Sequence, residues 1–277
     1  MKTALIQLNA SDSPEDNLPV TQGLIDEAAA AGAGFVLTPE VTNCLSASRT
    51  RQEEVLRHQK DDDPTLAGLR QQAERLGIWV LIGSIAVKTD DADGRFANRS
   101  FLIDPKGGIA AWYDKIHMFD VKVSETEQYR ESAGYRPGDR GVTARTPFGT
   151  VGMTVCYDLR FPGLYRRLAQ AGAEILTVPS AFAVPTGEAH WETLLRARAI
   201  ETGCYVLAPA QTGQHSATRG KERRTYGHSL AVGPWGDVLA DAGTEPGVVF
   251  VDVNRDEVTQ ARARIPAVNS EVDITWS

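Results

Sequence analysis

The sequence has few cysteines, no long apolar run and no low-complexity segment. Its three cysteines among 277 residues, Cys44, Cys156 and Cys204, are too widely spaced for a disulfide framework or a zinc knuckle. No stretch approaches the roughly 18 consecutive apolar residues that would cross a bilayer. These absences predict reduced thiols and no membrane partner.

Charge and the first residues narrow the class of protein further. The net charge of −7 argues against nucleic acid as a partner, but it does not exclude a small substrate. Residues 1–7, Met-Lys-Thr-Ala-Leu-Ile-Gln, lack the basic flank, apolar block and cleavage site of a signal peptide, and they predict a first strand. We therefore expect a cytoplasmic protein.

Strand-like and helix-like segments alternate along the whole chain without a linker or a repeat. We expect one domain over residues 1–277, with a core over about 1–253 and a C-terminal helix and tail over about 254–277. Short apolar runs rich in β-branched residues predict strands at 3–8, 34–38, 79–87, 99–103, 109–113, 150–156, 174–178, 204–208, 228–232 and 248–253.

Turn and capping residues complete the secondary-structure prediction. The segments 104–108 and 234–237 predict hairpin turns. Capping residues, first-turn prolines and terminal glycines predict helices over 64–77, over 187–202 with Thr186 as the cap, and from 255 onward. Mixed strands with helices between them favour an α/β fold of stacked sheets with the helices outside.

Cys156 is the cysteine with the most suggestive context. It ends an apolar run and precedes a helical segment at 164–171, so it lies where side chains reach the open end of a sheet. Helix dipoles and cations there would lower the thiol pKa and favour a nucleophilic thiolate. The residues alone also allow a buried structural cysteine. Cys204 lies in an apolar run and Cys44 in a polar loop, and none of the five histidines stands out as a base.

Three charged residues could serve such a nucleophile. Glu40 ends an apolar strand, where partial burial would raise its pKa towards neutrality and suit it to proton transfer. Lys115 follows the strand at 109–113 and would donate to an oxyanion if it were buried. Glu131 lies in a charged loop. A solvated surface role remains open for all three.

A metal site is a competing interpretation of the same region. Asp114, His117 and Asp120 are spaced three apart, as ligands on one helical face would be. This segment instead continues a strand into a loop and has no further carboxylates in a tight cluster. We therefore expect no metal ligands in this segment.

Motifs that occur in order along the chain match a known family. They are Leu-Thr-Pro-Glu at 37–40, Tyr-Asp-Lys-Ile-His at 113–117 and Gly-Met-Thr-Val-Cys-Tyr-Asp at 152–158, with Glu131 six residues before Pro-Gly. Through them the chain resembles the carbon–nitrogen hydrolases of the nitrilase superfamily over nearly its whole length. The resemblance implies a four-layer αββα sandwich.

The resemblance also implies roles for individual residues. Cys156 would be the nucleophile, Glu40 the general base and acid, and Lys115 an oxyanion donor together with the backbone amide of Tyr157. Glu131 would position Lys115 and the substrate. An enzyme of this kind cleaves a small carboxamide to a carboxylate and ammonia or an amine through a thioester, without a cofactor.

Further segments narrow the branch within the superfamily. Residues 180–182, 186–192 and 195–201 are similar to deaminated-glutathione and ω-amidases, which implies an α-keto ω-amide as the substrate. Hydrolysis of an N-carbamoyl amino acid or β-ureido acid would use the same four groups. A catalytically silent binding protein on this scaffold is the alternative from another class.

Candidate substrate contacts come from the same part of the chain. Phe182 and Thr186 are expected to line the pocket, and His190 could line it or merely pack. Arg160 is a candidate to hold a substrate carboxylate, because arginine binds carboxylates in a bidentate manner. A structural ion pair with Asp158 or Glu131 is the alternative for Arg160.

The resemblance finally concerns assembly. It implies at least a homodimer that packs through the helical segments 164–171 and 187–202. Relatives often carry a basic segment after Ile-Pro, whereas residues 267–277 here read Ala-Val-Asn-Ser-Glu-Val-Asp-Ile-Thr-Trp-Ser. The contribution of this tail to assembly is therefore left open.

Overall fold

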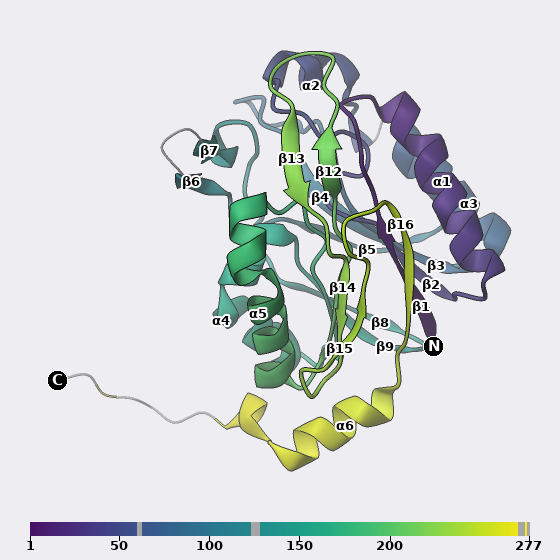
Figure 1. Ribbon diagram of the computed structural model, residues 1–277, viewed down its shortest axis with the longest axis vertical. Coiled ribbons are helices and arrows are strands. Elements are labelled where there is room, and N and C mark those ends of the chain that lie inside the picture. Colours follow the sequence, from purple (N-terminus) through teal and green to yellow (C-terminus); the bar gives the residue numbers. More distant parts are fainter. Residues whose placement is uncertain (60–62, 123–127, 271–274, 276–277) are drawn as a thin grey trace.

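Two six-stranded mixed sheets form the centre of the molecule (Figure 1). The computed structural model describes residues 1–59, 63–122, 128–270 and 275. In the first sheet the strand order is β16-β1-β2-β3-β4-β5, and β1, β2 and β3 run parallel. Its strands are β1 (Lys2–Gln7), β2 (Phe35–Leu37), β3 (Trp79–Val87), β4 (Ala97–Ile103), β5 (Ile109–Asp114) and β16 (Gly247–Asp252).

The second sheet has the order β15-β14-β11-β10-β9-β8, with β9, β10 and β11 parallel. Its strands are β8 (Val142–Thr146), β9 (Gly149–Met153), β10 (Ile175–Thr177), β11 (Tyr205–Ala208), β14 (Leu230–Val232) and β15 (Val238–Asp241). Two small antiparallel hairpins complete the strands, namely β6 (Asp120–Lys122) with β7 (Gln128–Arg130) and β12 (Thr212–His215) with β13 (Arg223–Tyr226).

Helices cover the outer faces of both sheets. The first sheet carries α1 (Pro14–Ala30) and α3 (Pro64–Leu76), and the second carries α4 (Pro162–Gln170) and α5 (Val184–Thr202), whereas α2 (Arg49–Val55) and α6 (Arg255–Arg264) lie at the two ends (Figure 1). Side chains alternate accordingly along β1. Leu5 joins the core between the sheets, while Ala4 and Ile6 join the core under α1 and α3. The predicted αββα sandwich is confirmed.

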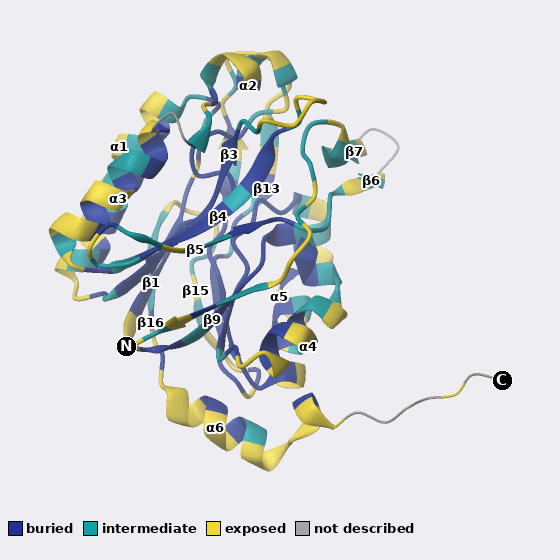
Figure 2. Cartoon of the chain, turned by 180° about the vertical axis from the view of Figure 1, so that it is seen from behind, coloured by how far each residue is buried: buried dark blue, intermediate teal, exposed yellow. Residues whose placement is uncertain are grey.

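Burial follows the same layering. The central strands are almost entirely buried, and α1 and α3 expose their outer sides, whereas α6 is exposed over most of its surface (Figure 2). This pattern explains why the sheets appear in the sequence as continuous apolar runs rather than as alternating ones. Within the described part of the chain, no helix has the length and apolar character needed to cross a membrane.

Local signals in the sequence predicted several boundaries correctly. Strand β3 has its predicted bounds, and α3 begins after the Asp63 cap and ends at Gly77 in the left-handed conformation. Both predicted hairpin turns join antiparallel neighbours. The start of α5 was predicted wrongly, because the helix begins at Val184 and not after a Thr186 cap. Pro185 occupies its first turn, where proline is well tolerated.

Residues 271–274 and 276–277 of the C-terminal tail lie outside the described residues, so most of the atypical tail cannot be compared with the prediction.

Candidate active site

The ends of β2, β5 and β9 bring three of the predicted residues to one cavity. Glu40 follows β2, Lys115 follows β5 and Cys156 begins the 3₁₀ helix η3 (Cys156–Arg160) after β9. All three line a cavity of about 400 Å³. Cys156 has a positive φ of 49°, which turns the chain sharply there, and its backbone N–H donates to the carbonyl of Pro179 at 3.0 Å. The parallel strands thus present the thiol at their carboxyl edge.

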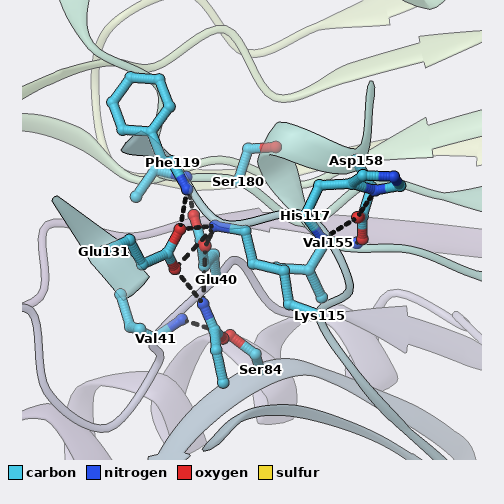
Figure 3. Close-up of polar contacts among 12 residues, drawn as sticks. Glu40, Val41, Ser84, Lys115, His117, Phe119, Glu131, Val155, Asp158 and Ser180 are labelled. Atoms are coloured by element: carbon cyan, nitrogen blue, oxygen red, sulfur yellow. Dashed lines mark hydrogen bonds and ion pairs between the residues drawn. The ribbon is translucent and has the colours of Figure 1, made fainter. Parts of the chain in front are cut away.

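Lys115 lies between two carboxylates (Figure 3). Its Nζ is 2.9 Å from Oε1 of Glu40, and it is 2.9 and 2.8 Å from the two oxygens of Glu131. The ammonium is buried, with 2% of the Lys115 side chain exposed. The backbone N–H of Phe119 holds the second oxygen of Glu131 at 2.6 Å. The structure therefore brings Glu131 to the same site as the other three residues.

The carboxylate of Glu40 is held by several donors. Asn98 donates through Nδ2 to Oε1 at 2.9 Å, and the backbone N–H of Ala181 donates to Oε2 at 2.9 Å. Gln211 donates to the backbone carbonyl of Glu40 at 3.0 Å. Because Glu40 has almost no rotational freedom left, its carboxylate stays directed at Lys115 and Cys156. Sequence reasoning missed Asn98, because it lies within a strand and carries no charge.

The protonation states differ from the sequence-based expectation. Burial, followed by the charge of Glu40, raises the pKa of the Cys156 thiol, whereas a lowered pKa was predicted. Burial raises the pKa of Glu40, but the charge of Lys115 and a hydrogen bond from the Cys156 thiol more than offset it. The net pKa of Glu40 is lowered, whereas a rise was predicted. Burial alone would lower the pKa of Lys115, but Glu131 and Glu40 raise it well above its usual range.

These directions define the charges of the resting site. Lys115 is a cation, Glu40 is a carboxylate and Cys156 is a neutral thiol. Both predictions failed because they considered only the local segment, whereas each pKa depends on groups from distant parts of the sequence. A neutral thiol thus lies beside a carboxylate that can accept its proton.

Asp158 connects the turn that carries Cys156 to the segment that carries Lys115. Its fully buried carboxylate accepts hydrogen bonds from the hydroxyl of Tyr113 at 2.6 Å and from the backbone N–H of His117 at 3.0 Å. It also accepts from the backbone N–H of Val155 at 2.9 Å. The ring Nδ1 of His117 lies 2.7 Å from the same carboxylate (Figure 3). Tyr113 and His117 are the residues two before and two after Lys115.

The predicted substrate contacts are only partly gathered at the cavity. Phe182 and Thr186 line it, but Arg160 and His190 are not among the lining residues. Instead, the guanidinium of Arg160 lies 3.4 Å from Nδ1 of the exposed His190. Arg223 of β13 does line the cavity, and sequence reasoning missed it. No signal in the sequence pointed to it, because residues 219–224 are all charged except Gly220.

The other two cysteines are buried as well. Cys44 also lines the cavity, where burial and the charge of Asp12 raise its pKa to about 12. Cys204 lies against the guanidinium of Arg262, and burial raises its pKa. Among the residues described, no three histidine, cysteine or acidic side chains are grouped as metal ligands.

The fold and the site together define a hydrolase of the nitrilase type, and comparison with known proteins places the chain in a family. The model of the carbon-nitrogen hydrolase family matches residues 2–263. The chain therefore belongs to the carbon–nitrogen hydrolases, and it is a cysteine-dependent amidohydrolase of the nitrilase superfamily.

Individual relatives are similar over nearly the whole chain. The deaminated glutathione amidase of Yersinia enterocolitica is 41% identical over 96% of this chain and 91% of its own length. The deaminated glutathione amidase of Mus musculus is 38% identical over 95% of this chain and 80% of its own.

Solved structures agree with this assignment. The C. elegans NitFhit protein superposes with a TM-score of 0.89 at 32% identity over 98% of this chain, which spans only 64% of that longer chain. Saccharomyces cerevisiae Nit3, described as a member of branch 10 of the nitrilase superfamily, superposes with a TM-score of 0.84 at 26% identity. It covers 96% of this chain and 94% of its own.

Proposed function

We propose that Cys156 is the nucleophile of amide hydrolysis, with Glu40 as the general base and acid and Lys115 as an oxyanion donor. The observation that carries this proposal is the buried contact of Lys115 with Glu40 and Glu131 beside a thiol that donates to Glu40. We assign to Glu131 the positioning of Lys115, since both of its oxygens contact the ammonium.

The first half-reaction forms a thioester. As the sulfur of Cys156 attacks the carbonyl carbon, its proton passes to Glu40 and negative charge develops on the carbonyl oxygen. Lys115 and the backbone N–H of Tyr157 stabilise this oxygen. The N–H of Tyr157 suits this role because it lies in the first turn of η3, where N–H groups have no acceptor within the helix. Glu40 then gives its proton to the leaving nitrogen, the carbon–nitrogen bond breaks, and ammonia or an amine departs.

The second half-reaction releases the acid. Glu40 takes a proton from a water molecule, whose oxygen attacks the thioester carbon. The carbon–sulfur bond breaks, the proton on Glu40 passes to the sulfur of Cys156, and the acid product leaves and loses its own proton to solvent to become a carboxylate. The site returns to its starting charges, so Glu40 acts in both halves.

We propose deaminated glutathione or a related α-keto ω-amide as the substrate. The support is the name of the relatives that are 37–41% identical, together with a cavity of about 400 Å³ that exceeds what a simple primary amide requires. A panel of deaminated glutathione, α-ketoglutaramate and N-carbamoyl-β-alanine, assayed for released amine or ammonia, tests this choice. Release of CO₂ with ammonia from the last compound as the preferred reaction would contradict it.

Replacement of the proposed nucleophile tests the chemistry. We expect Cys156→Ala to abolish turnover and to keep the fold, since the smaller side chain leaves the Glu40–Lys115 contact in place. Cys204→Ala is the matched control, because it also removes a buried thiol but does so away from the cavity. Retained turnover in Cys156→Ala would refute the mechanism. Loss in both variants with an altered circular dichroism spectrum would point to the fold instead.

The expected assembly and location are also proposals. We propose a homodimer that packs through α4 and α5. The side chain of Ile200 on α5 is 55% exposed, which supports a contact between α5 and a second subunit. Sedimentation of the purified chain tests it, and a monomer at micromolar concentration would contradict it. We further propose a cytoplasmic location, supported by the three free cysteines.

A further inference from the structure

Arg223 is a cation at the cavity that uses little of its hydrogen-bonding capacity within the described residues. One of its terminal nitrogens donates to the backbone carbonyl of Ala181, and its guanidinium lies 5.3 Å from the centre of the Tyr129 ring. Its Nε is buried and has no hydrogen-bond partner in the described residues. Within that same part of the chain, no carboxylate lies within ion-pair distance of Arg223. A buried donor without a partner is costly, so it calls for a ligand.

The other cations of the cavity are already engaged or exposed. Arg49 bonds through Nε to Glu53 at 3.0 Å and through its other nitrogens to the carbonyls of Gly134 and Gly94. Lys115 is held by two carboxylates. Arg130 lies on β7 with its side chain exposed. Arg223 is therefore the lining cation best able to accept a new anionic partner.

The surroundings of Arg223 hold it in place at the site. Thr225, which shares its face of β13, lies 2.7 Å from Nε2 of the buried His215. The backbone N–H of Tyr226 donates to the carbonyl of Phe182 at 3.0 Å, which joins β13 to the cavity wall. Ala181 connects both parts of the site, because its N–H binds Glu40 and its carbonyl accepts from Arg223. The backbone of a single residue, Ala181, therefore connects Arg223 to the Glu40 carboxylate.

We infer that Arg223 binds a carboxylate group of the amide substrate and thereby selects anionic amides. The inference rests on the proposed hydrolysis at Cys156 and adds the residue that recognises the substrate's charge. Guanidinium suits this role, because its planar donors match the two oxygens of a carboxylate. It also replaces Arg160, whose guanidinium lies against His190 and outside the cavity lining.

Pairs of substrates that differ only in one carboxylate test the inference. Glutaramate and pentanamide differ on the acyl side, and N-pentanoylglycine and N-propylpentanamide differ on the amine side. In Arg223→Gln we expect the ratio of kcat/KM, anionic over neutral, to fall about 10- to 100-fold in one pair, as the loss of a charged hydrogen-bonding partner implies. The pair that responds identifies the side. Arg223→Lys should recover part of the ratio, because it keeps the charge but not the planar donors.

Two controls separate this role from others. Arg224→Gln removes the neighbouring exposed arginine of β13 and should leave both ratios unchanged. If Arg223 acted only by lowering the pKa of Glu40, its loss would affect both members of each pair equally and shift the acid limb of the pH profile. Unchanged ratios in both pairs, or a wild-type preference for the neutral amides, would overturn the inference.

Binding without turnover keeps the result independent of the proposed chemistry. Calorimetric titration of glutaramate and N-pentanoylglycine into Cys156→Ala, with and without Arg223→Gln, measures recognition alone. We expect the affinity for one of the two to fall by a similar factor. If Arg223→Gln changed the affinity for neither ligand, the role of Arg223 would be overturned, whereas wild-type enzyme that binds these ligands but hydrolyses no amide would overturn the proposed function only.

Discussion

The buried carboxylate of Asp158 offers a demanding test of how the site is held together. It accepts four contacts, from the hydroxyl of Tyr113, the backbone and ring of His117 and the backbone of Val155. In Asp158→Asn one oxygen becomes an NH₂ group, which cannot accept. If the NH₂ group takes the place of Oδ2, it and the buried N–H of Val155 are two donors that face each other. The hydroxyl of Tyr113 must then turn so that it accepts a hydrogen bond instead of donating one.

The magnitude follows from these contacts. Loss of two buried acceptor interactions, at roughly 1–3 kcal/mol each, predicts a free energy of unfolding lower by about 2–6 kcal/mol. The same change loosens the turn of Cys156 against the segment of Lys115. A displacement of about 1 Å between reacting groups costs on the order of 100-fold in rate, so we expect kcat/KM to fall by about that factor.

Urea denaturation and amide turnover measure the two effects. The matched control is Asp241→Asn, because Asp241 also contacts a histidine, His228, at 3.0 Å but is 42% exposed. An exposed pair of this kind contributes at most about 1 kcal/mol, so this control should keep both stability and turnover. An Asp158→Asn variant with wild-type stability and wild-type kcat/KM would refute the linkage.

Further predictions concern protonation and packing. Because the pKa of Glu40 lies below its ordinary value of 4.5, the acid limb of kcat/KM should lie below pH 4.5. The stability that this carboxylate contributes should likewise be lost only as the pH falls through that lower pKa. An acid limb near pH 6 to 7 would contradict this prediction. Because the pKa of Cys156 is raised, the ultraviolet thiolate absorbance of wild type minus Cys156→Ser should stay flat from about pH 6 to 9, where an ordinary thiol with a pKa near 8.5 would titrate. Gly83→Ala should destabilise the fold by roughly 1–3 kcal/mol, since the added Cβ would lie 1.9 Å from the carbonyl oxygen of Thr38. Gly23→Ala, on α1 with open space around it, should stabilise the fold by up to about 1 kcal/mol. Equal melting temperatures for the two variants would contradict the packing argument.

The sequence was most informative where a signal is local. An apolar run rich in β-branched residues predicted β3 with its correct bounds, and Asp63 with Gly77 predicted both ends of α3. The start of α5 was missed because Thr186 is a good capping residue in isolation, whereas Pro185 allows the helix to begin earlier. Hairpin β12–β13 was missed as well, because its residues are polar and it pairs outside the two main sheets.

The site could be predicted in composition but not in charge state. The motifs identified Glu40, Lys115, Glu131 and Cys156, and the structure brings all four together. The pKa directions of Glu40 and Cys156 were wrong, because they depend on contacts between residues more than 70 positions apart. Arg223 follows Arg-Gly-Lys-Glu at 219–222, a charged pattern typical of a solvated turn, so its place at the cavity could not be anticipated.

The raised pKa of the buried thiol also affects how the protein withstands oxidants. Peroxide attacks the thiolate of a cysteine, and susceptibility to it follows thiolate content and exposure. Cys156 is neutral at rest and only 7% exposed, so we expect it to resist oxidation to the sulfenic acid. The nucleophilic form would arise only while an amide occupies the cavity and Glu40 takes the proton. We therefore expect turnover by the purified protein to survive a peroxide treatment that oxidises exposed cysteines of low pKa.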